Sequence, residues 1–259
     1  MSSLNPDNLP AGVDSLLVAR ILDCCKAASE SHVIKFTDFL DPFHREFVRP
    51  LVANFFGVRC FEDGGYAGAE KKRLAIFPDY YSPGDIQMPI AALEITLSDP
   101  TRVLSHRDYL GAIVGLGLKR SYIGDILTFS GGAQALVARE IAGAVCGLEA
   151  VNKFKVEVVE IPPYCLHWEE QPVRTVSCTV ASVRLDAVLS SGLGIGRGKA
   201  AELIKSDKVK VNWRQISQPA FQLKEGDVLS VQGKGRLVLS LVGGETKKGR
   251  LRIELKKFN

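Results

Sequence analysis

This sequence of 259 residues lacks a long apolar run, a leader segment and a cysteine motif. No stretch of about 18 apolar residues occurs, so we expect no membrane-spanning helix. Residues 1–14 lack a basic stretch followed by an apolar core, so we expect no secretory signal. The six cysteines form no CxxC pair and do not stand at metal-site spacing from the four histidines. Scattered cysteines fit a reducing cytosol. We therefore expect a cytoplasmic protein with no metal, cofactor or membrane partner.

Sequence patterns of nucleotide-using enzymes are also missing. The glycine-rich segment 62–73 has neither the GxxxxGK(S/T) arrangement of a phosphate loop nor a GxGxxG. His106-Arg107-Asp108 is similar to part of a kinase catalytic loop, but the other kinase segments do not occur. Adjacent residues on a helix point in different directions, so these side chains cannot form a relay. We predict no catalytic residues, and we interpret Ser105 and Asp108 as a helix capping box.

Charge is divided unevenly along the chain, although its net value is only +4. Residues 1–173 contain 16 Lys and Arg against 22 Asp and Glu, a net charge of −6. Residues 174–259 contain 17 against 7, a net charge of +10. An acidic body joined to a basic, folded segment is typical of a nucleic-acid-binding module attached to another domain.

Two short helices followed by a small antiparallel sheet are predicted for residues 184–236. Apolar residues recur three and four apart in both helices, at Leu185, Val188, Leu189, Ala200, Leu203 and Ile204. Alternation in residues 208–212 predicts a strand, and Gly226-Asp227 predicts the turn into the next one. Helices this short are unstable alone, so we expect them to pack on each other and on the sheet.

Cations surround this predicted core. Arg184 and Arg197 start the two helices, where the helix dipole disfavours a cation. A phosphate there would meet backbone amides and a guanidinium group together. Each cation alone is more often a solvated surface charge, but the clustering favours RNA binding. We predict RNA contacts from Arg184, Arg197, Lys199, Lys205, Lys208, Lys210, Asn212, Arg214, Lys234 and Arg236. Either a secondary RNA contact or simple exposure is predicted for Lys71, Lys72, Arg73, Lys119 and Arg120.

The residues before this module predict an α+β chain with two further parts. Helical spacing predicts a helical N-terminal region, residues 1–73, with Asp41-Pro42 starting its second helix. Residues 74–163 predict a strand at 74–77 and then, from Ile90, the order strand, helix, strand, strand, helix, strand. That order is typical of a ferredoxin-like, RRM-like fold, but the aromatic stacking signature of an RNA-binding sheet is missing. A proline-containing linker, residues 164–174, then leads to the C-terminal domain, residues 175–259.

The C-terminal segment resembles the S4 domain, a small RNA-binding domain named after the fourth protein of the small ribosomal subunit. The resemblance is carried by Arg184, Leu185, Asp186, Val188, Leu189, Arg197, Ala200, Leu203, Ile204, Val209, Val211, Asn212, Gly226, Asp227, Val231 and Gly233. It implies two helices on a small antiparallel sheet that bind structured RNA, mostly through its backbone. The sequence departs from the pattern at Asp207-Lys208, where a glycine is usual before the strand.

Two further blocks resemble the YlmH-type family, which includes the photosystem II S4-domain proteins. One is residues 64–73, GGYAGAEKKR, and the other is LSHRDYLGA at 104–112 with its continuations at 116–120 and 123–126. The resemblance covers nearly the whole chain. It implies binding to ribosomal or transfer RNA on the large ribosomal subunit, and a role in rescuing obstructed ribosomes.

Two other functions remain open from the sequence. The S4 domain often targets RNA-modifying enzymes, so the chain could be a subunit or remnant of a pseudouridine synthase or methyltransferase. However, Arg184-Leu185-Asp186 is not followed by the Thr-x-Gly of a pseudouridine synthase. The other alternative is a protein-interaction adaptor that uses its acidic body. We expect a non-catalytic, monomeric RNA-binding protein.

Overall fold

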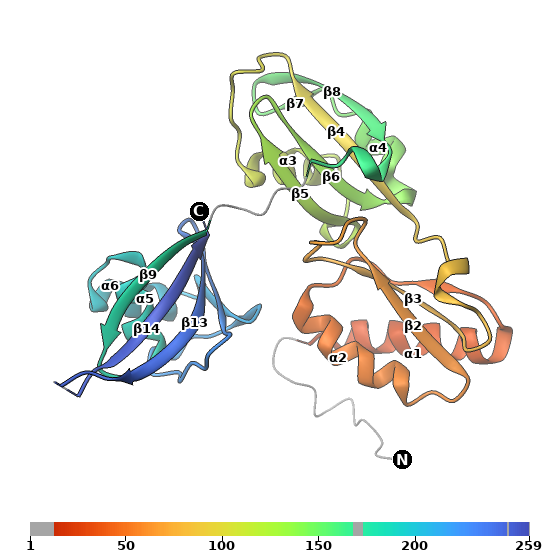
Figure 1. Ribbon diagram of the computed structural model, residues 1–259. Helices are drawn as coiled ribbons and strands as arrows, with labels where there is room; N and C mark the ends of the chain where they lie inside the picture. The colour runs from red at the N-terminus through yellow and green to blue at the C-terminus, as the bar shows by residue number, and fades with distance from the viewer. Residues whose placement is uncertain (1–12, 168–172, 248, 259) are drawn as a thin grey trace. The chain divides into compact units, whose positions relative to one another are not determined.

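The computed structural model describes residues 13–167, 173–247 and 249–258. These residues fall into two compact units, residues 13–167 and residues 173–258. Figure 1 shows the first unit as two sheets with their helices and the second as one sheet with a helix pair.

The first unit begins with two helices on a three-stranded sheet (Figure 1). The elements are α1 (Ser15–Ser31), β1 (Lys35–Phe36), α2 (Pro42–Ala53), β2 (Val58–Asp63) and β3 (Arg73–Pro78). The strand order is β1-β3-β2, and both pairings are antiparallel. As predicted, Asp41 caps α2: its carboxylate accepts the His44 amide at 2.9 Å, with Pro42 in the first turn.

The expectation of a purely helical N-terminal region is therefore corrected. The predicted strand 74–77 exists, but it lies in β3 at the centre of the N-terminal sheet, so the expected boundary after Arg73 cuts this strand. Leu74 and Ile76 pack against α1 and α2, while Ala75 and Phe77 fill a second small core on the other face. This sheet was not predicted from the sequence, because β1 is only two residues long and β2 lacks a clear alternation of apolar and polar residues.

A ferredoxin-like domain completes the first unit. Its elements are β4 (Ile90–Leu97), α3 (His106–Gly115), β5 (Ile123–Phe129), β6 (Gly132–Ala138), α4 (Ala142–Cys146), β7 (Ala150–Val151) and β8 (Phe154–Ile161), with short 3-10 turns η2 (Pro83–Asp85), η3 (Arg120–Tyr122), η4 (Arg139–Ile141) and η5 (Pro163–Cys165). The strand order β5-β6-β4-β8-β7, all antiparallel, matches the predicted split arrangement. Tyr109 and Ile113 of α3 and Val145 of α4 are fully buried in its core.

The second unit is a six-stranded antiparallel sheet covered by a helix pair (Figure 1). Its elements are β9 (Val173–Val180), α5 (Leu185–Leu193), α6 (Arg197–Lys205), β10 (Val209–Val211), β11 (Arg214–Gln215), β12 (Val228–Val231), β13 (Gly235–Glu245) and β14 (Leu251–Phe258). The strand order is β11-β10-β12-β13-β14-β9. A Cβ atom on Gly192 would lie 2.7 Å from Leu255 and 2.8 Å from Leu237, so α5 packs closely on the sheet.

The two predicted helices and the strands at β10 and β12 are confirmed, whereas β9, β13 and β14 were not predicted. Strand β9 begins at Val173, so the last two residues of the expected linker belong to the sheet. Residues 168–172 of that linker lie outside the described residues. Asp207, the departure from the S4 pattern, has a φ of 58°, so it adopts the left-handed conformation that makes glycine usual there.

Candidate nucleic-acid interface

Arg184 and Arg197 meet on a single carboxylate, that of Asp186. Arg184 caps the start of α5 and Arg197 is the first residue of α6. Arg184 donates from Nε and Nη2 to Asp186 at 3.1 Å each, and Arg197 does so at 3.1 and 3.3 Å. The Asp186 side chain is 7% exposed, against 36% for Arg184 and 55% for Arg197. The three side chains therefore form one cluster with its cations outward.

The charge of this cluster is fixed by its hydrogen bonds. Burial alone would raise the pKa of Asp186, but hydrogen bonds from Arg184 and Arg197 outweigh it and hold the pKa below its ordinary value. The carboxylate thus stays ionised, and the cluster carries a net charge of +1. Asp186 also offsets the unfavourable position of the two cations at helix starts, so their placement has a structural explanation beside any binding role.

The remaining predicted contacts form two groups. Lys199 and Lys205 are exposed on α6, next in sequence to the Arg184–Arg197 cluster. The other six residues lie on or beside the strands: Lys208, Lys210, Asn212 and Arg214 on β10, β11 and the adjoining turns, Lys234 between β12 and β13, and Arg236 in β13. Val209 and Val211 are buried against the helices, so Lys210 projects from the opposite face of the sheet. The ten residues are therefore not all on one face.

Asn212 links two neighbouring strands of the sheet. Its side-chain amide donates to Asp227 at 2.8 Å, and its side-chain oxygen accepts the Val228 amide at 2.8 Å. These bonds tie the end of β10 to the start of β12, which explains an asparagine at this position without invoking RNA.

The expected secondary contact is wrong for Arg73. This side chain is 3% exposed and donates to the carbonyls of Thr37 and Pro89, each at 2.7 Å, and to the carboxylate of Glu140 at 3.0 Å. It cannot reach RNA, because it lies at the start of a strand buried between β1 and β2. The simple alternative of an exposed charge run is wrong here for the same reason.

The other four secondary residues differ among themselves. Lys71 donates from Nζ to the Ile123 carbonyl at 2.9 Å, and burial, followed by the nearby charge of Arg120, lowers its pKa. Lys72 is 24% exposed and lies 3.9 Å from Glu62. Lys119 and Arg120 are exposed before β5. Among these four residues, only Lys119 and Arg120 are exposed enough to contact RNA.

Asp125 joins the two sequence blocks that carry the family resemblance. Its carboxylate accepts the Tyr66 hydroxyl at 3.0 Å and the backbone amides of Glu70 and Lys71 at 2.7 and 3.2 Å. Burial raises the pKa of Asp125, and these hydrogen bonds lower it by less. The block at 64–73 is therefore a loop anchored on β5, not a phosphate loop. Sequence analysis missed this role because the two partners are more than fifty residues apart.

The sheet face used by RNA-recognition modules is covered in this domain. Gln134, fully buried on β6, donates to Glu94 at 2.7 Å and accepts the His167 amide at 2.7 Å, so the chain after β8 crosses this face. Gly65 lies against Leu136 on the same face, where an added Cβ would approach to 2.8 Å. The segments at Gly65 and His167 both cover this face, and the carboxylate of Glu94 lies beneath the second. No surface for base stacking is therefore open over these residues.

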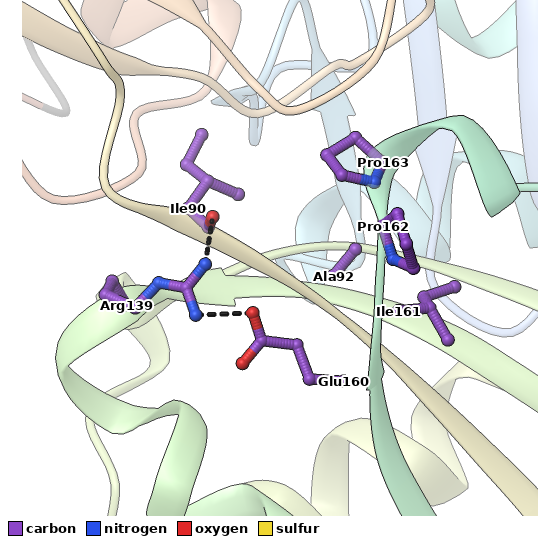
Figure 2. A pocket seen from close by; sticks show the side chains of 7 residues that line it. All are labelled: Ile90, Ala92, Arg139, Glu160, Ile161, Pro162 and Pro163. Carbon is purple, nitrogen blue, oxygen red and sulfur yellow. Dashed lines mark hydrogen bonds and ion pairs between the residues drawn. The ribbon is translucent and has the colours of Figure 1, made fainter.

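A pocket of about 320 Å³ lies at the end of β8 (Figure 2). Arg139 crosses it, donating to the Glu160 carboxylate and to the Ile90 carbonyl, and the rest of the lining is apolar. Figure 2 shows these two charged side chains directed at each other. The pocket is thus built around an ion pair rather than around a nucleophile and a base.

No group of three or more His, Cys, Asp or Glu side chains in the described part of the chain could hold a metal ion. No helix within the described ranges combines the length and the apolar character needed to cross a membrane.

Three family models match the chain. They are "YlmH, N-terminal" over residues 14–81, "Putative RNA-binding domain in YlmH" over 83–164 and "S4 domain" over 183–229. The "Ribosome-associated protein quality control protein P2" of Bacillus subtilis (strain 168) is 34% identical over 237 residues, which are 91% of this chain and 92% of that protein. An "Uncharacterized RNA pseudouridine synthase" of Aquifex aeolicus (strain VF5) is 42% identical over 52 residues, 20% of this chain and 22% of that protein. The solved structure of "Cell division protein ylmH from Streptococcus pneumoniae" has a TM-score of 0.49 at 25% identity, covering 60% of this chain and 94% of that one.

A helix pair on an antiparallel sheet, together with the matching family model, defines this chain as a protein of the S4-domain class. The Bacillus subtilis protein aligns with 91% of this chain, so the similarity covers both units. The chain belongs to the YlmH family. The predicted family and the α+β fold class are thereby confirmed.

Proposed function

We propose that this protein is a non-catalytic RNA-binding protein that binds ribosomal or transfer RNA on the large ribosomal subunit. In this proposal it acts in the cytoplasm, as a monomer, in the rescue of stalled ribosomes. The observation that supports it best is the Arg184–Asp186–Arg197 cluster within the S4 domain, in a C-terminal segment, residues 174–259, of net charge +10. The printed name of the Bacillus relative, a ribosome-associated quality control protein, supports the ribosomal context.

The cluster suits a phosphate ligand for a physical reason. Each guanidinium is already oriented by the buried carboxylate, so little side-chain freedom remains to be lost on binding. The bonds to Asp186 use Nε and Nη2 of each arginine, which leaves Nη1 directed elsewhere. A backbone phosphate could then receive hydrogen bonds from both arginines without breaking the ion pairs.

Binding to isolated large ribosomal subunits and to tRNA, measured over a series of salt concentrations, tests the proposal. Removing the arginines alone would strand a buried carboxylate, so the variant is Arg184→Gln, Asp186→Asn and Arg197→Gln together. We expect its affinity to fall roughly 10- to 100-fold, with a shallower dependence on salt. The matched control, Arg174→Gln with Arg252→Gln, removes two exposed arginines outside the predicted interface. Salt-independent binding, or equal losses in both variants, would contradict the proposal.

An RNA-modifying enzyme is the second candidate, favoured by the match to a pseudouridine synthase. That match spans a stretch about as long as the S4 domain match, as expected if only a targeting module is shared. Incubating the protein with ribosomal RNA and measuring uridine isomerisation and methyl transfer decides between the two. Turnover in either assay would replace the non-catalytic proposal. Ribosome capture that survives ribonuclease treatment would instead favour the adaptor alternative.

A further inference from the structure

The turn between β10 and β11 contains a tryptophan in an unfavourable backbone conformation. Val211 and Arg214 are paired, so Asn212 and Trp213 form a two-residue hairpin turn. Their φ angles are 46° and 63°, both in the left-handed region, as a type I′ turn requires. Asparagine tolerates this region and glycine prefers it, but a bulky aromatic residue there is an outlier. Such strain is found where a side chain is needed for another purpose.

The Trp213 ring lies among cations at the end of the sheet. The guanidinium carbon of Arg236 is 5.7 Å from the ring centroid, within the range of a cation–π contact. Arg236 is paired in register with Ser230, and Ser230 with Lys210, so both cations lie in one row across the outer face of the sheet. Strand β11, which follows the ring, is an edge strand of this sheet, and its Arg214 pairs with Val211 and so lies on the face opposite to Lys210.

This combination has the chemistry of a site for unpaired nucleotides. Nucleobases stack on aromatic rings and on guanidinium planes, while nearby cations neutralise the backbone phosphates. A paired helix cannot offer its base faces, so it would use only the cations. The ring and the row of cations therefore distinguish single-stranded from double-stranded RNA.

We propose that Trp213 and Arg236 form a stacking platform for an unpaired base, with Lys210 holding an adjoining phosphate. This platform lies on the outer face of the S4 sheet and is separate from the Arg184–Asp186–Arg197 cluster. The proposal rests on the proposed RNA-binding function and narrows its ligand to RNA with an exposed loop, bulge or single strand.

Trp213→Gly in the full-length protein separates a stacking role from a structural one. Glycine suits the turn, so we expect the thermal unfolding midpoint to be unchanged or higher. Affinity for a short single-stranded RNA should nevertheless fall about tenfold, within the roughly 5- to 150-fold range of a lost base–aromatic stack. Affinity for the blunt duplex of the same strand with its complement should change little. Trp213→Phe, which keeps an aromatic ring, should retain most of the single-strand affinity.

Fluorescence gives an independent readout, because the chain has only two tryptophans, Trp168 and Trp213. In Trp168→Phe, emission comes from Trp213 alone, and stacking of a base should quench it on addition of the single strand but not of the duplex. Unchanged emission, unchanged single-strand affinity of Trp213→Gly, or equal losses on both RNAs would overturn the platform. Failure of the unsubstituted protein to bind large ribosomal subunits and tRNA would overturn the proposed function and the platform with it, whereas binding to those but not to the single strand would overturn the platform alone.

Discussion

Asp186 is a buried carboxylate that positions two cations from different helices. Its bonds to Arg184 and Arg197 join the start of α5 to the start of α6. Neither arginine is deeply buried, so removal of the carboxylate would leave both cations able to reach water. The two ion pairs therefore contribute more to the orientation of the guanidinium groups than to the stability of the core.

The first prediction concerns the pH dependence of stability at this residue. The pKa of Asp186 is lower in the folded protein than its ordinary value of about 3.9. The contribution of Asp186 to the free energy of unfolding is therefore fully present above about pH 4. It is lost as the pH falls through the lower pKa that Asp186 has in the folded protein. Asp186→Asn should cost about 1–2 kcal/mol of unfolding free energy at neutral pH. It should also flatten the decline of stability below pH 4.

Urea unfolding at a series of pH values measures both effects. Glu202→Gln is the matched control, because it removes an exposed carboxylate from α6 and leaves the cluster intact. If Asp186→Asn and the control followed the same acid-side curve, Asp186 would not be the group that links this cluster to pH.

At the scale of single residues, the sequence identified candidate RNA-binding residues but not the side chains to which they bond. The positions of Arg184 and Arg197 followed from helical spacing and from the S4 pattern. The shared carboxylate did not, because a residue in the first turn of one helix reveals nothing about an arginine eleven residues later. Asp207 was recognised as a departure, and its left-handed φ of 58° shows that an aspartate meets the same backbone requirement as the usual glycine.

Strand β3 is the element on which the first unit is organised. It is buried along its whole length, and Arg73 at its start bonds to the residue after β1, to the residue before β4 and to η4. The arginine thus connects the N-terminal sheet to the ferredoxin-like domain through two segments, at Pro89 and Glu140.

The second prediction follows from these bonds. Arg73→Met should lower the unfolding free energy by roughly 2–4 kcal/mol, because the buried carbonyls of Thr37 and Pro89 would lose their donor. Urea denaturation followed by circular dichroism measures the loss. Lys72→Met, one residue earlier and partly exposed, should change it by less than about 1 kcal/mol. Equal effects of the two substitutions would contradict the structural role of Arg73.

Elements with strong local signals were predicted, and elements defined by long-range pairing were not. Caps and apolar spacing located α2, α3, α5 and α6, and the element order gave the ferredoxin-like topology. Strand β14 pairs with β9, some seventy residues away, so this partner lies outside any local window. Strand β1 has only two residues, and its pairing with β3 is tertiary information.

At the scale of the whole molecule, the two units have opposite charge. The part up to Val173 has a net charge of −6 and the part after it +10. Long-range attraction to RNA is therefore concentrated in the second unit, which contains the S4 domain (the S4 unit). The first unit repels RNA except where local cations are exposed. Lys119 and Arg120 are exposed cations of this kind, beside the loop anchored by Asp125.

A secondary contact through this pair would act by multivalency, since the two units are covalently joined. On a large ribosomal subunit both units could engage together, whereas a short RNA stem-loop would be covered by the S4 unit alone. Lys119→Gln with Arg120→Gln should then weaken binding to the large subunit roughly tenfold and leave stem-loop binding unchanged. Lys26→Gln with Lys35→Gln removes equal charge from exposed sites in the same unit and should have little effect. A comparable loss in both pairs would show that total charge matters, and no loss in either would confine RNA binding to the S4 unit.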